Sequence, residues 1–313
     1  SSPWHPGIPM VHARLPRLAL YEAWHGVRRP RVESLVGPVD VVHGTGAATP
    51  PTAGPLVVTV HDLAFRRFPD LFSRHGLRFF ERALRLTIDH ADAVMVPSAA
   101  TRDDCLAAGI ALDRCTVVPW GVRRPEISGD DAAAAAAMVG PNDGYVVVVG
   151  TLEPRKNLRR LFDAWKRLDR DDLRLVVVGP DGWGDALGDS LPTGVVLTGF
   201  VPTGVRDALY AGARCSVYPS IFEGFGLPVL ESMAVGCPVV TAAGTASAEL
   251  IVDGGGVAVD VTDADAIAAG ITAVVDDPDT RAALARSATE IAAAATWERT
   301  AAQVVDVYRS VIG

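Results

Sequence analysis

Residues 145–168 read YVVVVGTLEPRKNLRRLFDAWKRL. Five apolar residues run to Gly150 without polar alternation, which predicts a strand that is buried on both faces, as in a parallel sheet. After the loop, apolar residues recur at the i, i+3, i+4 and i+7 spacing of an amphipathic helix: Leu158, Leu161, Phe162 and Trp165. Asn157 precedes them as the expected N-cap. The stretch therefore predicts one strand–loop–helix unit.

Similar Val-rich runs, bounded by Gly or Pro and separated by helical patterns, occur along the whole chain. They are Val39–His43, Leu56–His61, Ala93–Pro97, Thr116–Pro119, Leu173–Val178, Val195–Thr198, Ser216–Tyr218, Pro238–Thr241 and Val257–Val261. Repeated strand–helix units of this kind predict parallel sheets covered by helices. We therefore expect two Rossmann-like, doubly wound α/β domains in tandem. Ligands of such domains bind beyond the carboxyl ends of the strands, so two facing domains would define a cleft.

The chain length of 313 residues suits two domains of roughly 150 residues each. The join is expected where the sequence becomes acidic, Ala-rich and bounded by Pro and Gly. The predicted parts are an N-terminal domain over 1–124, a linker over 125–144, a C-terminal domain over 145–296, and a closing helix over 297–313 that packs back toward the N-terminal domain.

The composition, 49% hydrophobic and 21% charged, is that of a globular protein and excludes disordered, collagen-like and disulfide-stapled classes. No apolar run reaches the length of about 20 residues that a membrane span needs, and no signal peptide is expected at the start. The cysteines form no CxxC pair, so we expect free thiols and a cytoplasmic protein. The formal net charge of −8 disfavours a nucleic-acid partner.

A second informative stretch, residues 220–231, reads SIFEGFGLPVLE. Pro at the first helical position predicts a helix start after a strand, with the amides of Phe225, Gly226 and Leu227 open to an anion or to sugar oxygens. Glu231 is expected in the first turn, reaching back so that it and Glu223 converge on one pocket. The alternative is that Glu223 is a loop acid and Glu231 only complements the helix dipole.

The loop of the first stretch carries two adjacent cations, Arg155 and Lys156, directly before a helix. Arginine offers a bidentate fork to phosphate oxygens and lysine a point charge. A solvated loop is the alternative. The two cations lie near the helix start after Glu223, and Gly150 and Thr151 end the strand before them. This combination predicts a diphosphate site.

The Glu223-x7-Glu231 spacing within EGFGLPVLE, with GTLEPRKN at 150–157, resembles the retaining nucleotide-sugar glycosyltransferases of glycosyltransferase family 4, which have the GT-B fold. The resemblance runs from about Leu15 to the C-terminus. It includes VVHGT at 41–45, VTVHDL at 58–63, VPS at 96–98, VPWGV at 118–122 and WERTA at 297–301. The segments TVHDLAF and RFP are most similar to sequences of the bacterial mannosyltransferase-like branch, which builds surface polysaccharides.

The resemblance implies the site roles. Glu223 would bind hydroxyls of the donor hexose, helped by the amides after it, and Glu231 would hold the ribose. Arg155 and Lys156 would neutralise the diphosphate and stabilise the departing nucleotide, without a metal cofactor.

Two further roles are implied. The backbone around Val201 would approach the nucleobase. His61, at the carboxyl end of a strand in the first domain, would face the reacting sugar across the cleft. The alternative for His61 is a histidine that only satisfies backbone groups.

The implied function is the transfer of a hexose, with mannose from GDP-mannose as the first choice, to a saccharide or lipid-linked acceptor. Two alternatives stay open, a nucleotide-sugar epimerase of similar architecture and a catalytically silent nucleotide-sugar-binding protein. The family's first domain opens with a strand, a Gly-rich turn and a helix. We find no such opening before Val39, so this domain is expected to be shortened.

One basic pattern lies outside these motifs. Arginines recur at helical spacing at positions 74, 78, 82 and 85. We expect the solvated outer face of a soluble helix there, with peripheral contact to an anionic membrane as the alternative interpretation.

Overall fold

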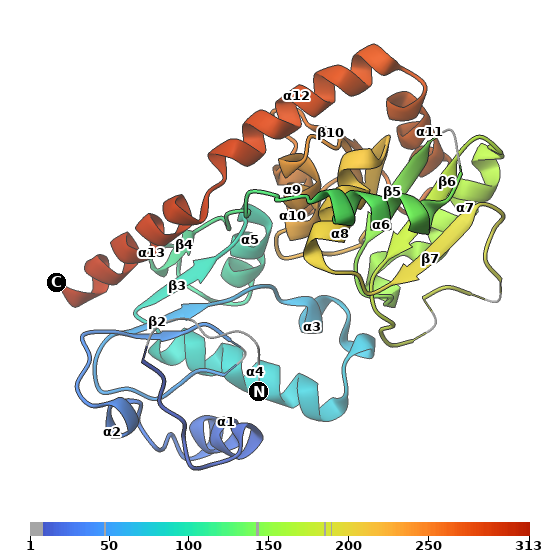
Figure 1. Ribbon diagram of the computed structural model, residues 1–313. Helices are drawn as coiled ribbons and strands as arrows, with labels where there is room; N and C mark the ends of the chain where they lie inside the picture. The colour runs from blue at the N-terminus through green and yellow to red at the C-terminus, as the bar shows by residue number, and fades with distance from the viewer. Residues whose placement is uncertain (1–8, 47, 142–143, 185, 189) are drawn as a thin grey trace. The chain divides into compact units, whose positions relative to one another are not determined.

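The computed structural model describes residues 9–46, 48–141, 144–184, 186–188 and 190–313 (Figure 1). The chain divides into two compact units. Unit 1 comprises the residues up to Pro97 together with Thr101–Val118 and Ala302–Gly313, and unit 2 comprises Ser98–Ala100 and Pro119–Ala301.

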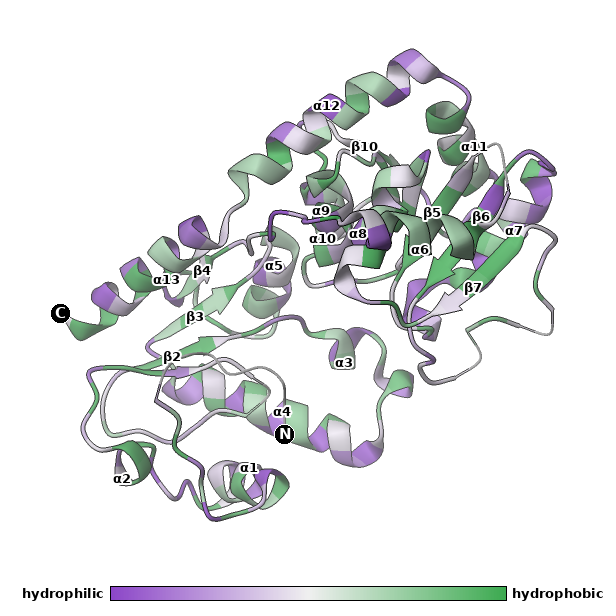
Figure 2. Ribbon diagram, viewed as in Figure 1, coloured by the Kyte–Doolittle hydropathy of each residue, from purple (hydrophilic) through white to green (hydrophobic). Residues whose placement is uncertain are grey.

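Every described strand overlaps one of the ten predicted runs, and all strand pairs are parallel, which confirms the predicted α/β class. The strands are β1 (Val42–Gly44), β2 (Leu56–Thr59), β3 (Ala93–Val96), β4 (Cys115–Val117), β5 (Tyr145–Val149), β6 (Arg174–Val178), β7 (Val195–Gly199), β8 (Cys215–Tyr218), β9 (Val239–Ala242) and β10 (Gly256–Val259). Figure 2 shows β5, and β6 after its first residue Arg174, in the hydrophobic colour, and these residues are mostly buried.

Helices connect these strands. In unit 1 they are α1 (Arg17–Gly26), α2 (Glu33–Val36), α3 (Ala64–Arg67), α4 (Arg74–His90) and most of α5 (Ala99–Ala107), with 3-10 turns η1 (Pro69–Leu71) and η2 (Leu112–Arg114). In unit 2 they are α6 (Gly129–Val139), η3 (Pro154–Lys156), α7 (Leu158–Leu168), α8 (Thr203–Gly212), α9 (Leu227–Ala234), α10 (Ala246–Glu249), α11 (Ala264–Val275) and α12 (Pro278–Ala294). The closing helix α13 (Trp297–Ile312) belongs to unit 1 from Ala302 on.

The sheet of unit 1 has the sequential order β1-β2-β3-β4. Alternate strand residues point to opposite faces. One face packs on α4 and α5 through residues such as Leu56, Val94 and Leu84. The other face packs on α13, where Val57, Met95 and Val307 share a buried cluster. Among the described residues, from residue 9 onward, β1 is the first strand.

The sheet of unit 2 has the order β10-β9-β8-β5-β6-β7. From β5 the chain winds outward through β6 and β7, then returns to place β8 on the other side of β5 and winds outward through β9 and β10. This reversal is the topological switch point of a doubly wound sheet, and ligands bind at the carboxyl ends of the two strands that flank it. We therefore expect the ligand site of unit 2 among the residues that follow β5 and β8.

The segment expected as a linker, 125–144, contains the helix α6. A capping box between Ser128 and Asp131 starts this helix. Ala135 and Val139 pack against residues of α8 such as Leu209. Since Ala135 and Val139 are buried in a core cluster of unit 2, the helix α6 is part of that unit and not a free connection.

A glycine that follows β6, Gly179, allows the backbone at the end of β5 to approach closely. Gly179 has φ +151°, and a Cβ there would overlap the carbonyl oxygen of Gly150. We expect Gly179→Ala to lower the free energy of unfolding by about 2–4 kcal/mol through overlap and backbone strain. Urea denaturation measures this loss. Gly199→Ala is the matched control, because Gly199 also has positive φ but nothing lies within 4 Å of its added Cβ; it should cost only about 1–2 kcal/mol. Equal losses in the two variants would show that the close approach to Gly150 is unimportant.

In the part of the chain that the structure describes, no helix combines the length and the apolar character needed to cross a bilayer.

The four cysteines, Cys105, Cys115, Cys215 and Cys237, are buried free thiols. The predicted arginine face of α4 is exposed at Arg74, Arg78, Arg82 and Arg85.

Candidate functional site

The loops that follow β5 and β8 lie together at the switch point of unit 2. The loop after β5 contains η3, which carries Arg155 and Lys156. The loop after β8 carries Glu223 and then enters α9. The backbone amide of Ile221 donates to the carbonyl oxygen of Arg155 at 3.0 Å, so the two loops are joined directly.

Asn157 joins the same two loops through its side chain. It precedes α7 as predicted, but its side chain does not cap that helix. With φ +59°, Asn157 instead donates through Nδ2 to the carbonyl oxygens of Pro219 at 3.2 Å and Val261 at 2.8 Å. The prediction of Asn157 as the N-cap residue is therefore confirmed, but the residue makes no capping hydrogen bond, because more distant carbonyl groups engage its amide.

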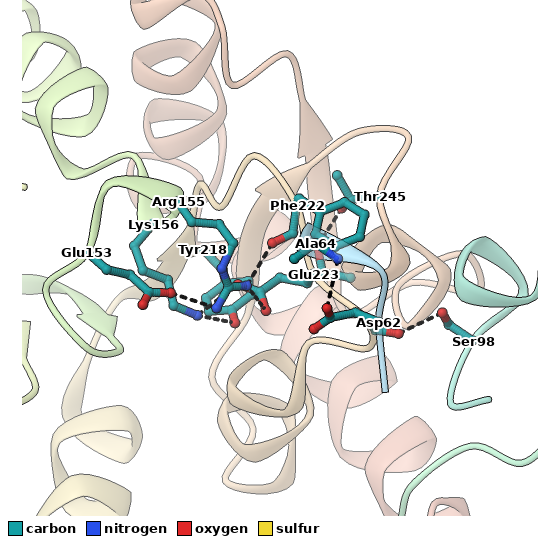
Figure 3. A network of polar contacts seen from close by, with 12 residues as sticks. Asp62, Ala64, Ser98, Glu153, Arg155, Lys156, Tyr218, Phe222, Glu223 and Thr245 are labelled. Atoms are coloured by element: carbon teal, nitrogen blue, oxygen red, sulfur yellow. Dashed lines mark hydrogen bonds and ion pairs between the residues drawn. The ribbon is translucent and has the colours of Figure 1, made fainter. Parts of the chain in front are cut away.

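Glu223 forms ion pairs with both predicted phosphate-binding cations. Its Oε1 lies 2.7 Å from Lys156 Nζ, and its Oε2 lies 2.7 Å from Arg155 Nη1. Arg155 Nη1 also donates to the carbonyl oxygen of Phe222 at 2.8 Å, and Nη2 lies 2.6 Å from Glu153 Oε1. Figure 3 shows Arg155 and Lys156 pointing toward Glu223. The cations are thus balanced by two carboxylates.

The cluster is largely buried. The Glu223 side chain is 10% exposed and that of Glu153 is 3% exposed. Burial alone would raise the pKa of Glu223, but the charges of Lys156 and Arg155 outweigh it and hold that pKa below its usual range. Glu223 is therefore an anion at neutral pH, and the buried cations need a replacement anion if it leaves.

Tyr218, the last residue of β8, supports Lys156. Its hydroxyl accepts from Lys156 Nζ at 2.8 Å, and the ammonium lies 4.7 Å from the ring centroid. Burial and the neighbouring charge of Glu223 raise the pKa of Tyr218 well above its usual range, so the phenol stays neutral. Tyr218 was not among the predicted site residues, although a tyrosine that ends a buried strand at the ligand-binding edge of a sheet is a signal for such a role.

Gly150 and Thr151 line a pocket with Lys156, Tyr218 and Ser220. The pocket lies at the carboxyl ends of β5 and β8 and is tightly closed, with no space that a water molecule could fill. A Cβ on Gly150 would lie 3.1 Å from Lys156 Cε. The glycine therefore leaves room for the lysine side chain to lie across the strand end.

The start of α9 is open. Gly226, at φ +101°, precedes the helix, and Pro228 is its second residue, one position later than predicted. The amides of Phe225, Gly226 and Leu227 donate to no residue that the structure describes. The Phe225 side chain is buried, with its ring centroid 5.3 Å from that of Trp120. The helix start thus offers three N–H groups to an acceptor.

Glu231 lies elsewhere than predicted. It is the fifth residue of α9 and not part of the first turn. Its Oε1 accepts from Arg206 Nη1 at 2.7 Å, and Arg206 also pairs with Asp207. Burial raises the pKa of Glu231, and Arg206 offsets only part of this. With Arg206 and Thr203, Glu231 lines a pocket of about 170 Å³ that does not include Glu223. The two glutamates therefore have different cation partners.

Val201 is buried in the core cluster beside α8, so only its backbone is available to a ligand. The neighbouring Phe200 is 78% exposed. The backbone contact with a nucleobase stays a prediction.

His61 lies in unit 1, two residues after β2. Its Nε2 lies 2.8 Å from the carbonyl oxygen of Thr45. This contact fits the alternative in which His61 satisfies a backbone group, and its role toward the reacting sugar stays a prediction.

Three other residues of these ion pairs, Glu153, Arg206 and Asp207, were not predicted from the sequence. For Glu153, its position in the loop after β5, two residues before Arg155, is a signal that could have indicated it. The partners of Arg206 and Asp207 come from distant parts of the chain, so no local pattern indicated them. Among the described residues, no group of three or more His, Cys, Asp or Glu side chains is arranged to hold a metal ion.

Comparison with family models and curated proteins identifies relatives. The model "Glycosyl transferases group 1" matches residues 136–291, and "Glycosyltransferase Family 4" matches residues 3–124. The chain is 30% identical over 282 residues to O-antigen chain mannosyltransferase B of Escherichia coli, covering 86% of this chain and 74% of that protein. It is 29% identical over 307 residues to MMP alpha-(1->4)-mannosyltransferase of Mycolicibacterium hassiacum, covering 88% and 72%.

Solved structures show the same fold. Anabaena HepE in complex with UDP-glucose has a TM-score of 0.70 at 24% identity, covering 82% of this chain and 72% of that chain. Sucrose-phosphate synthase from Thermosynechococcus elongatus has a TM-score of 0.73 at 20% identity, covering 97% and 86%.

Proposed function

The chain belongs to glycosyltransferase family 4, and on this premise we propose that it transfers a hexose, with mannose from GDP-mannose as the first choice, with retention at the anomeric carbon. The observation that carries the proposal is the buried cluster of Arg155, Lys156 and Glu223 at the switch point, next to an open helix start. Cations beside a helix N-terminus can bind the oxygens of a diphosphate. A carboxylate in the same cluster can accept hydrogen bonds from the hydroxyls of a sugar that is attached to the diphosphate.

Each residue then has a defined task. Arg155 and Lys156 take the charge that develops on the departing nucleoside diphosphate, which is electrostatic stabilisation of a leaving group. Glu223 accepts hydrogen bonds from hexose hydroxyls, and Glu231 from the ribose. A donor phosphate oxygen helps to deprotonate the acceptor on the face from which the nucleotide leaves, and this gives retention.

The choice of mannose rests on the two mannosyltransferase relatives. The complex of HepE with UDP-glucose makes a uridine donor the alternative. The site side chains described above have no assigned contact with the base, guanine or uracil. The titration with nucleotides described below decides between the two donors.

We place the reaction in the cytoplasm, where the four free thiols would stay reduced. The acceptor is a saccharide or a lipid-linked saccharide, in line with the O-antigen role in the name of one relative. The exposed arginines of α4 would suit a lipid-linked acceptor at an anionic membrane.

Calorimetric titration with GDP, UDP and ADP, each with magnesium and with EDTA, tests the proposal. We expect one nucleotide to bind with the same Kd in both conditions. Binding that disappears with EDTA would indicate a metal-dependent site, and no binding of any nucleotide would reject the donor site. The matching donor sugar, incubated with and without saccharide acceptors, then separates the alternatives. Isomerisation without acceptor would indicate an epimerase, and binding without turnover a silent binding protein.

A further inference from the structure

The carboxylate of Glu231 has one bound oxygen and one free oxygen. Its Oε1 accepts from Arg206 Nη1 at 2.7 Å, and no described residue donates a hydrogen bond to its Oε2. The Glu231 side chain is 18% exposed and lines a pocket of about 170 Å³ in unit 2. A ligand in this pocket therefore meets a carboxylate that can still accept hydrogen bonds.

Arg206 is held in place by a second carboxylate. Its Nε and Nη2 donate to Oδ1 of Asp207 at 3.1 Å and 2.8 Å, and the Asp207 side chain is only 4% exposed. Oδ2 of Asp207 accepts from Arg123 Nη2 at 3.0 Å. Asp207 thus fixes the orientation of the guanidinium, and the guanidinium in turn fixes Oε1 of Glu231.

The charges of this network are balanced. All four side chains line the pocket, and they carry two positive and two negative charges: Arg123, Arg206, Asp207 and Glu231. Such a pocket can bind a neutral polar group without leaving an unpaired charge. Lys156 and Glu223, in contrast, do not line it, so the diphosphate would be bound elsewhere in the unit.

A hydroxyl group matches the hydrogen-bonding capacity that remains in the pocket, because a hydroxyl both donates and accepts. Three of the five N–H groups of Arg206 donate to Asp207 and Glu231, so two stay unused beside the free oxygen of Glu231. In a nucleoside diphosphate, the neutral part that carries hydroxyl groups is the ribose.

We propose that Arg206 is a positioning residue, which holds Oε1 of Glu231 and so keeps Oε2 in place to accept a hydrogen bond from a ribose hydroxyl. The inference rests on the proposed function, in which Glu231 binds the ribose of the donor. Arg206 makes the one hydrogen bond that a described residue donates to the carboxylate of Glu231. Its presence therefore determines how strongly the chain distinguishes ribose from deoxyribose.

The test compares each nucleoside diphosphate, GDP or UDP, with its 2′-deoxy and 3′-deoxy analogues by calorimetry. For the wild type, we expect the analogue that lacks the contacted hydroxyl to have a Kd about tenfold to a hundredfold higher than the parent nucleotide, since a hydrogen bond to a charged group is lost. In Arg206→Ala this ratio should fall to about threefold or less, because the carboxylate is no longer held. Both ligands are measured on the same variant, so a general loss of affinity cancels from the ratio.

Pyrophosphate and a matched arginine variant are the controls. Inorganic pyrophosphate has no ribose, so Arg206→Ala should bind it as the wild type does. Arg286→Ala removes the same charge from an exposed position of α12 and should keep the full ratio. Arg206→Lys, which keeps the charge but lacks the planar fork of the guanidinium, should give an intermediate ratio.

Arg206→Ala also leaves Asp207 with one arginine partner, so urea unfolding and circular dichroism accompany the titrations. If this variant does not fold, Arg206→Lys combined with Glu231→Ala tests the same inference. Glu231→Ala alone should remove the discrimination, and Arg206→Lys should then change the ratio no further. A further change in the Glu231→Ala background would show that Arg206 acts independently of Glu231, which overturns the proposal.

The remaining outcomes separate the two levels of inference. Wild-type protein that binds no nucleotide would reject the proposed function. Wild-type protein that binds the parent nucleotide and both deoxy analogues equally would reject the ribose contact of Glu231, and the role of Arg206 with it. A full ratio in Arg206→Ala, or weakened pyrophosphate binding by that variant, would reject only the positioning role of Arg206.

Discussion

Replacing Glu223 with glutamine is expected to tighten nucleoside diphosphate binding and to slow sugar transfer. In the donor-free protein Glu223 occupies the two cations that the diphosphate needs, at 2.7 Å from each. A diphosphate must displace this carboxylate before it can bind. Because the glutamine side chain carries no charge, Arg155 and Lys156 would be released from this competition.

The expected size follows from the energies of buried ion pairs. Removing an internal competitor for two buried cations should lower the Kd for the nucleoside diphosphate about tenfold or more. Arg155 retains Glu153 and Lys156 retains Tyr218, so both cations stay in place. The kcat should fall by about 10²-fold, because the hexose loses the carboxylate that orients it.

Calorimetry with the nucleoside diphosphate and steady-state assays with the donor sugar measure the two effects. Glu290→Gln, at an exposed position of α12, is the control for the loss of one negative charge. Weaker nucleotide binding by Glu223→Gln would mean that the carboxylate positions the cations and does not compete for them. A normal kcat would remove Glu223 from the sugar site.

Replacing Lys156 with alanine is expected to cause the largest loss of nucleotide binding. Its ammonium is largely buried between Glu223 and Tyr218, so the bound diphosphate would face it in a poorly solvated site. Truncating one partner of a buried charge pair typically costs about 2–5 kcal/mol. The Kd for GDP or UDP should therefore rise by about 10²-fold or more.

The chain offers a matched control, since Lys166 is its only other lysine and is exposed on α7. Lys166→Ala removes the same charge from the same unit and should bind the nucleotide as the wild type does. Circular dichroism of both variants checks that the fold is retained. Nucleotide binding by Lys156→Ala that matches the wild type would show that the diphosphate lies elsewhere.

The strands and the two loops of the site could be predicted from local sequence. Tyr145–Val149 was predicted with the bounds that the structure has, because a strand that is buried on both faces must be apolar at every position. The cations before α7 and the glycine-rich start of α9 were also visible, because helix starts depend on a few adjacent residues. The family followed from these same local motifs.

The partners of the site residues depended on the three-dimensional arrangement. Lys156 and Glu223 are 67 positions apart, and Asn157 reaches a carbonyl group 104 positions away. The first pair forms because the strand order places β5 beside β8, and the second because the loop after β10 reaches the start of α7; no local pattern encodes either arrangement. Glu231 pairs with Arg206 for the same reason, since α8 and α9 meet only in the folded unit. The residues and their local conformation can be predicted from neighbours in the chain, whereas the charge balance at Glu223 arises only when distant segments pack together.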